Sequence, residues 1–292
     1  MIFKGSGTAI ITPFDNEGVN FQTFKRLLDY QLENGTDALI VLGTTGEPAT
    51  MNEKEKNEVL EFAVNYINGR IPVIAGIGTN NTSTSINNAK QAANIGVDGL
   101  LAVTPYYNKC TQKGLINHFF AIADSTDKPM ILYNVPSRTG VNILPDTYAT
   151  LCQHENIVAT KEACGNIEQI TETFAKVQGK MDIYSGDDAI ILPVLALGGI
   201  GVISVAANCV PDVVSNICKS YFEGDIEVCR QLQFKLVPLV KALFSEVNPI
   251  PVKAAMNILG FDCGVPRLPL TEMENKAVLL SELKKILPNL NN

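Results

Sequence analysis

The chain has 292 residues, of which 46% are hydrophobic and 18% charged, so it can form one large α/β barrel or two ordinary domains. Its net charge of -7 comes from scattered acidic residues without a basic patch, which argues against nucleic acid as a partner. The N-terminal residues contain no signal-peptide core, and the uncharged stretch 189–207 is broken by Pro193 and by glycines, which argues against a membrane span. We therefore expect a cytoplasmic protein without a membrane partner.

Cysteine and histidine usage is typical of neither a disulfide scaffold nor a zinc site. The seven cysteines are odd in number and form no C-x-x-C pair, so we expect buried thiols in a reducing cytoplasm. Neither of the two histidines, His118 and His154, lies at metal-ligand spacing from another histidine or cysteine. We therefore expect no protein-bound metal.

Short apolar segments alternate with segments of helical periodicity along most of the chain. The apolar segments rarely alternate with polar residues, as expected for parallel strands that are buried on both faces. Stop signals separate the segments: Asn34 and Gly35 follow the first helix, and Asn52 can cap the second. The expected strands are 7–12, 38–42, 72–76, 99–103, 129–133, 157–160, 182–185 and 201–204. The expected helices are 21–33, 53–67, 82–95, 111–125, 146–153, 166–177, an apolar segment after 188, and 211–222.

Eight strand–helix units favour a closed (β/α)8 TIM barrel over an open sheet. The stretch 189–207 then contains a buried helix, a glycine turn and a buried strand. We therefore predict an α/β barrel domain over residues 1–224 and a C-terminal helical extension over residues 225–292. Within the extension, the expected helices are 226–246, 249–259 and 271–286.

Functional side chains of such a barrel come from the carboxyl ends of its strands. Lys161 ends an apolar strand, where burial disfavours the charged form of its amine. The other candidates are Thr44 and Thr45 after the second strand, Tyr106 and Tyr107 after the fourth, Tyr133 and Arg138 after the fifth, Gly186 after the seventh and Ile203 in the eighth.

This set is rich in hydroxyl groups and poor in carboxylates and histidines, which argues against metal-dependent hydrolysis and against a Ser-His-Asp triad. A lysine among hydroxyl groups suits carbonyl chemistry through a Schiff base, because an apolar setting lowers the pKa of the amine from about 10.4. Hydroxyl groups can also pass the protons that imine formation requires. The turn Gly43-Thr44-Thr45-Gly46 exposes backbone N–H groups that suit a carboxylate.

Each candidate also has a purely structural interpretation when it is taken alone. The Lys161 amine could reach water or pair with Glu162. Thr44 and Thr45 could serve only as caps of their turn. Tyr133 could be a core residue with its hydroxyl in water, and the charge of Arg138 could simply be solvated. The convergence of these residues on one face of one fold favours the functional interpretation.

Three segments together resemble one known family. They are Gly43-Thr-Thr-Gly-Glu47, Tyr133-Asn-Val-Pro-Ser-Arg-Thr-Gly140 and the strand-end Lys161. The whole chain is similar to the dihydrodipicolinate synthase family, within the class I pyruvate aldolase/lyase superfamily that includes N-acetylneuraminate lyase. The resemblance implies a cofactor-free lyase that condenses pyruvate with L-aspartate 4-semialdehyde to 4-hydroxy-tetrahydrodipicolinate. This is the first committed step of the diaminopimelate route to lysine.

The resemblance also implies a role for each candidate residue. Lys161 would form the imine with pyruvate, and Tyr133 would serve as the acid/base for imine formation and ring closure. Thr44 and Tyr107 would complete a proton relay, with Tyr107 reaching in from a neighbouring subunit of a homotetramer, a dimer of dimers. Substrate binding would involve Thr45 on the pyruvate carboxylate, Ile203 beside pyruvate, Gly186 as a further position, and Arg138 on the carboxylate of the semialdehyde.

Two other functions stay open from the sequence. One is that of a sibling enzyme such as N-acetylneuraminate lyase or a 2-keto-3-deoxy-sugar aldolase. Arg138 argues against it, because a polyol substrate needs no carboxylate clamp. The other is a barrel kept as a binding or regulatory protein, and the intact Lys161, Tyr133 and Thr44 argue against that.

The resemblance extends to regulation by lysine. Sensitive relatives bind the amino acid at a subunit interface through a serine, two histidines, a glutamate, an asparagine and a tyrosine. At these positions the chain has Pro48, Glu53 and Lys56, Thr84, Asn80 and Tyr106. We expect lysine to inhibit weakly or not at all, because Thr84 lacks the carboxylate and Lys56 adds a like charge, which Glu53 only partly offsets.

Overall fold

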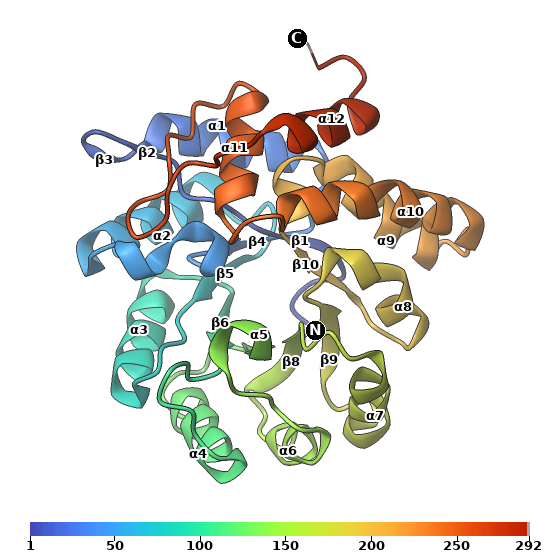
Figure 1. Cartoon of the computed structure of the whole chain (residues 1–292). Coiled ribbons are helices and arrows are strands. Elements are labelled where there is room, and N and C mark those ends of the chain that lie inside the picture. Colours follow the sequence, from blue (N-terminus) through green and yellow to red (C-terminus); the bar gives the residue numbers. More distant parts are fainter. Residues whose placement is uncertain (291–292) are drawn as a thin grey trace.

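Eight short parallel strands close into a barrel in the computed structural model, which describes residues 1–290 (Figure 1). The strands are β1 (Gly5–Ala9), β4 (Ala38–Val41), β5 (Val73–Gly76), β6 (Gly99–Val103), β7 (Met130–Asn134), β8 (Ile157–Glu162), β9 (Asp182–Ser185) and β10 (Gly201–Ser204). Consecutive strands of this set are neighbours, and β10 pairs with β1 to close the barrel. The predicted TIM-barrel fold is confirmed.

Helices surround the barrel and cover the outer face of its strands (Figure 1). Those that follow strands are α1 (Phe21–Glu33), α2 (Glu53–Ile67), α3 (Thr82–Ile95), α4 (Gln112–Ala123), α6 (Pro145–Leu151), α7 (Ile167–Val177), α8 (Ile191–Ala196) and α9 (Pro211–Phe222). The predicted cap of α2 is confirmed: the Asn52 side chain accepts a hydrogen bond from the backbone of Glu55, whose carboxylate accepts one from the backbone of Asn52.

Short elements occupy several loops after the strands. They are the 3-10 helices η1 (Thr44–Gly46), η2 (Pro48–Thr50), η3 (Asp188–Ile190) and η4 (Ala206–Asn208), and the one-turn helix α5 (Pro136–Thr139). A small hairpin of β2 (Phe14–Asp15) and β3 (Gly18–Val19) follows β1. The uncharged stretch 189–207 contains α8 and β10, as predicted. No helix among residues 1–290 is both long and apolar enough to cross a membrane.

The C-terminal extension consists of α10 (Ile226–Leu243), α11 (Ile250–Ile258) and α12 (Ala277–Ile286). The helix α10 packs against both α9 and α12 (Figure 1). Leu236 of α10 and Leu283 of α12 belong to the same hydrophobic core as the helices around the barrel. The boundary that we predict at residue 224 falls in the turn between α9 and α10.

Three predicted boundaries are wrong by three or more residues, and several others by one or two. The first strand ends at Ala9 instead of residue 12, because the Ile11 N–H donates to the Asn208 side chain instead of a neighbouring strand. The last helix begins at Ala277 instead of residue 271, because the Asn275 side chain accepts the Ala277 N–H in a local turn that competes with a longer helix. The helix α10 ends at Leu243 instead of residue 246.

The barrel interior forms a core separate from the strand–helix layer. Phe3, which precedes β1, stacks on Tyr184 of β9 with 4.3 Å between the ring centres. The Tyr184 hydroxyl donates a hydrogen bond of 2.6 Å to the Phe3 carbonyl. This pair fills the interior with aromatic carbon, so a polar side chain in the same space loses most of its hydration.

Candidate active site

Lys161 lies inside the barrel at the end of β8, against the ring of Tyr133 from β7. Strand pairing sets Tyr133, Lys161 and Tyr184 in one row across three strands. The Lys161 amine lies 4.2 Å from the centre of the Tyr133 ring, and the lysine is only 4% exposed. Glu162 does not pair with it, because its carboxylate accepts hydrogen bonds from Tyr148 and Asn134 instead. Both structural interpretations of Lys161, solvation and pairing with Glu162, are therefore wrong.

Burial gives both members of this pair unusual pKa values. It lowers the pKa of Lys161 to about 8; the Asp188 carboxylate opposes this shift and the Arg138 guanidinium adds to it. Burial raises the pKa of Tyr133 to about 12, with Arg138 acting in the opposite direction. At neutral pH a useful fraction of the lysine is therefore a neutral amine, while the tyrosine keeps its proton.

A cavity of about 410 Å³ lies at the carboxyl ends of the strands and reaches Tyr133 of this pair, whereas Lys161 is buried and does not form part of its wall. Thr44, Tyr133 and Arg138 form part of its wall, as does Tyr106. Thr44 reaches the cavity because η1 is a tight turn, in which the Gly46 N–H donates to the Gly43 carbonyl at 2.8 Å. The cavity has the size and mixed lining of a site for small molecules.

Thr45 and Arg138 are joined by a residue of the C-terminal extension, Asn248. Thr45 is 2% exposed, and its hydroxyl accepts a hydrogen bond of 3.1 Å from the Asn248 side-chain amide. The Arg138 guanidinium donates to the Asn248 backbone carbonyl at 3.2 Å. The loop between α10 and α11 therefore holds both residues that we expect to bind substrate carboxylates.

The remaining candidates differ in where they lie. A side-chain carbon added at Gly186 would meet Lys161 Cγ at 3.0 Å, so only glycine leaves the lysine stem unobstructed. Ile203 packs in the barrel interior with Tyr133. Tyr107 is separate: it is 90% exposed, has a φ of +73° and is absent from the wall of the cavity. Of the candidates, Thr44, Tyr106, Tyr133 and Arg138 thus line the cavity, whereas Lys161, Thr45 and Ile203 are buried and, like Gly186, do not form part of its wall. Tyr107 lies outside the cavity and is exposed.

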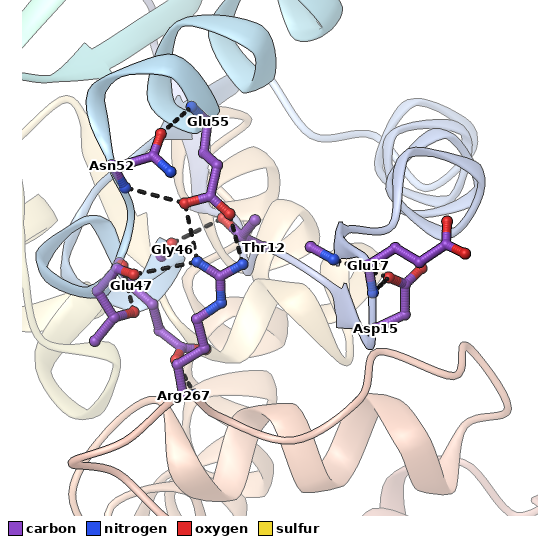
Figure 2. A network of polar contacts seen from close by, with 10 residues as sticks. Thr12, Asp15, Glu17, Gly46, Glu47, Asn52, Glu55 and Arg267 are labelled. Carbon is purple, nitrogen blue, oxygen red and sulfur yellow. Dashed lines mark hydrogen bonds and ion pairs between the residues drawn. The ribbon is translucent and has the colours of Figure 1, made fainter.

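A buried polar network behind the Thr44 turn was not predicted. Glu47 ends η1 with a φ of +56°, and its carboxylate contacts Lys253 of α11 at 2.7 Å. Its other oxygen accepts the backbone N–H of Arg267 at 2.9 Å. Figure 2 shows the Arg267 side chain reaching Glu55 of α2 with two hydrogen bonds, of 2.6 and 3.0 Å. These contacts hold Glu47 in place at one end of the turn, and Thr44 at the other end lines the cavity.

No local signal announces this network or the role of Asn248. The sequence motif contains Glu47, but its partners come more than 200 residues later.

Among residues 1–290, no group of three or more His, Cys, Asp or Glu side chains is arranged to hold a metal ion.

Comparison with known proteins identifies relatives over nearly the whole chain. Residues 2–289 match the model of the dihydrodipicolinate synthetase family. The 4-hydroxy-tetrahydrodipicolinate synthase of Caldicellulosiruptor bescii is 56% identical over 276 residues, which are 94% of this chain and 93% of that protein.

Solved structures agree with this match. The dihydrodipicolinate synthase of Thermotoga maritima superposes with a TM-score of 0.95 at 45% identity and covers 99% of both chains. A protein described as the first monomeric dihydrodipicolinate synthase variant gives a TM-score of 0.96 at 45% identity, covering 99% of this chain and 98% of that one. The chain therefore belongs to the dihydrodipicolinate synthetase family.

Proposed function

We propose that this chain is a lyase that condenses pyruvate with L-aspartate 4-semialdehyde to give 4-hydroxy-tetrahydrodipicolinate. The observation that carries the proposal is the Lys161 amine, which is buried against Tyr133 with its pKa lowered to about 8. Full-length relatives named 4-hydroxy-tetrahydrodipicolinate synthase support the choice of reaction. The same family resemblance supports a place in the diaminopimelate route to lysine.

The first half of the reaction activates pyruvate. The neutral Lys161 amine adds to the ketone carbon of pyruvate, and loss of one water leaves a protonated imine. The Thr45 hydroxyl, which already accepts a hydrogen bond from Asn248, is free to donate its own proton to the pyruvate carboxylate. The Tyr133 hydroxyl carries protons to the departing oxygen and, with Thr44 and Tyr107, exchanges them with solvent. Loss of a methyl proton then gives the enamine.

The second half joins the two substrates. The enamine carbon attacks the aldehyde carbon of the semialdehyde, and the new oxyanion takes up a proton. The amino group of the semialdehyde then displaces Lys161 from the imine carbon and closes the ring, which returns the free lysine. One water is released overall. Arg138 would hold the semialdehyde carboxylate, since a planar guanidinium binds a carboxylate through two hydrogen bonds.

The same proposal includes the assembly and location of the enzyme. We propose a homotetramer, a dimer of dimers, in the cytoplasm. Tyr107 supports at least the dimer, because an exposed aromatic outside its own cavity is suited to reach a neighbouring one. The division into a barrel of residues 1–224 and an extension of residues 225–292 also remains our proposal. A fully active monomer in sedimentation experiments would contradict the shared relay.

Trapping the imine tests the function directly. Incubation with pyruvate and borohydride should add one reduced pyruvyl group to the peptide that contains Lys161, as read by mass spectrometry. Labelling of a different lysine, or of none, would contradict the proposal. Replacing pyruvate with acetate is the matched control, because acetate has no ketone and should leave the peptide unlabelled.

A further inference from the structure

Asn248 belongs to the wall of the cavity, and its backbone carbonyl and side-chain N–H are already used in hydrogen bonds. The residue is 4% exposed and lines the cavity with Thr44, Tyr133 and Arg138. Its backbone carbonyl accepts from Arg138, and its side-chain N–H donates to Thr45. The side-chain oxygen Oδ1 is buried and has no hydrogen-bond partner among residues 1–290. A buried polar atom without a partner is costly, so a ligand atom that satisfies it gains affinity.

The hydroxyl of Thr45 determines which end of the amide is open. If the amide nitrogen donates to Thr45, the threonine keeps its own proton for a substrate carboxylate. If the amide were reversed, Thr45 would donate to Asn248 and could offer the carboxylate nothing. The open end is therefore the oxygen, which requires a hydrogen-bond donor.

Only one of the two proposed substrates brings such a donor. Pyruvate, as the carboxylate, has no N–H or O–H group. L-aspartate 4-semialdehyde carries an ammonium on the same carbon as its carboxylate. Because Arg138 contacts the backbone of Asn248 at 3.2 Å, a carboxylate held by Arg138 would have its neighbouring ammonium within reach of the Asn248 side chain.

We propose that Asn248 Oδ1 accepts a hydrogen bond from the amino group of the semialdehyde and so makes the enzyme select an amino-aldehyde over an aldehyde without nitrogen. This inference rests on the proposed function. An amide oxygen can accept from the ammonium and from the neutral amine, and it carries no full charge, so it does not prevent the proton loss that ring closure requires. A carboxylate in its place would favour the charged form.

Two aldehydes that differ only in the amino group provide the test. L-aspartate 4-semialdehyde is measured as substrate, and 4-oxobutanoate, which lacks the amino group, as a competitive inhibitor against it. In Asn248→Leu the KM for the semialdehyde should rise about 10- to 100-fold, while the inhibition constant of 4-oxobutanoate changes less than about threefold. The backbone carbonyl that holds Arg138 remains in this variant. Equal weakening of both aldehydes would overturn the proposal, because Asn248 would then act only through Arg138.

A second variant keeps the test independent of folding. Asn248→Asp retains an acceptor, so it should keep the preference for the amino-aldehyde, while kcat falls because the charged amine is held. Both variants lose the donation to Thr45, so both should raise the KM for pyruvate. Loss of the preference in Asn248→Asp would also overturn the proposal. Borohydride trapping of pyruvate on Lys161 reports an intact site in each variant. A wild-type enzyme that fails to condense the two substrates would refute the proposed function, whatever the variants do.

Discussion

Two buried lysines in this molecule sit over aromatic rings at nearly the same distance. Lys161 lies 4.2 Å from the centre of the Tyr133 ring, and Lys253 lies 4.1 Å from that of Phe14. Lys253 also has a carboxylate partner, Glu47, at 2.7 Å, whereas no carboxylate among residues 1–290 lies within ion-pair distance of Lys161. Burial lowers the pKa of both amines; at Lys253 a carboxylate in direct contact opposes this, whereas at Lys161 only Asp188, which makes no ion pair with it, does so.

The difference separates a reactive lysine from a structural one. An aromatic face attracts a cation but supplies no charge to balance it, so Lys161 is ready to lose its proton. The ion pair with Glu47 favours the charged form of Lys253 and joins α11 to the Thr44 turn. Removing either lysine should therefore affect different properties of the protein.

Lys161→Met should show the largest effect on activity. We expect condensation to fall by more than about 1,000-fold, because the nucleophile is gone. The free energy of unfolding should not fall. The folded-state pKa of Lys161, about 8, lies below its unfolded value, so the charged amine destabilises the native state below pH 8. Urea unfolding at pH 7 should show the variant at least as stable as wild type. This advantage should shrink as pH rises from 8 to about 10.5, the ordinary lysine value.

Lys253→Met should have the opposite signature. Breaking a buried pair leaves the Glu47 charge uncompensated, and we expect a loss of about 3–5 kcal/mol in the free energy of unfolding. Adding Glu47→Gln should restore part of it. Lys176→Met, which breaks an exposed pair with Asp146, is the matched control and should cost less than about 1 kcal/mol. A change in Lys253→Met no larger than in this control would refute the contrast between the two lysines.

Arg138→Ala should separate the two substrates. Loss of a charged contact costs about 2–5 kcal/mol in kcat/KM for the semialdehyde, while pyruvate still forms its imine on Lys161. An unchanged kcat/KM would remove Arg138 from the clamp. Arg138→Lys keeps the charge but not the two-pronged contact, so it should restore only part of the loss.

The same variant should shift the pH dependence of Lys161. In wild type, imine trapping at fixed pyruvate should rise with pH up to about 8 and then level off, as the amine loses its proton. The Arg138 guanidinium helps to lower this pKa, so Arg138→Ala should move the profile to higher pH. A profile that stays in place, or moves to lower pH, would contradict this electrostatic link.

The smallest effect should be that of added L-lysine on the rate, because Lys56 places a like charge where sensitive relatives bind the amino acid. Lys56 lines the cavity and pairs with Glu53 at 2.8 Å, so the Glu53 carboxylate is already engaged. We expect micromolar L-lysine to leave the rate unchanged. Cooperative inhibition in that range, beyond a sodium chloride control of equal ionic strength, would show that the altered positions still form a site.

Chain order and periodicity predicted the barrel because each strand and helix has its own local signal, an apolar run or a helical repeat bounded by stop residues. Lys161, Tyr133 and Arg138 were predictable because the carboxyl ends of all eight strands meet at one face of a (β/α)8 barrel. Asn248, Lys253 and Arg267 were not. They form hydrogen bonds with residues about 200 positions earlier in the chain. The sequence around them predicts only a helix and its flanking loops. The positions of those contacts follow from how α11 and its flanking loops pack on the barrel, which no local pattern encodes.

The Glu47 network has a consequence for the order in which the chain is made. Strand β4 and the Thr44 turn leave the ribosome early, while Lys253 and Arg267 belong to the last sixth of the chain. Until those residues emerge, the Glu47 carboxylate lacks Lys253 and the Arg267 N–H and must stay hydrated. The turn that contains Thr44 therefore cannot pack into the protein interior. A nascent chain can thus fold its early strands and helices, yet it gains a formed site only when synthesis is nearly finished.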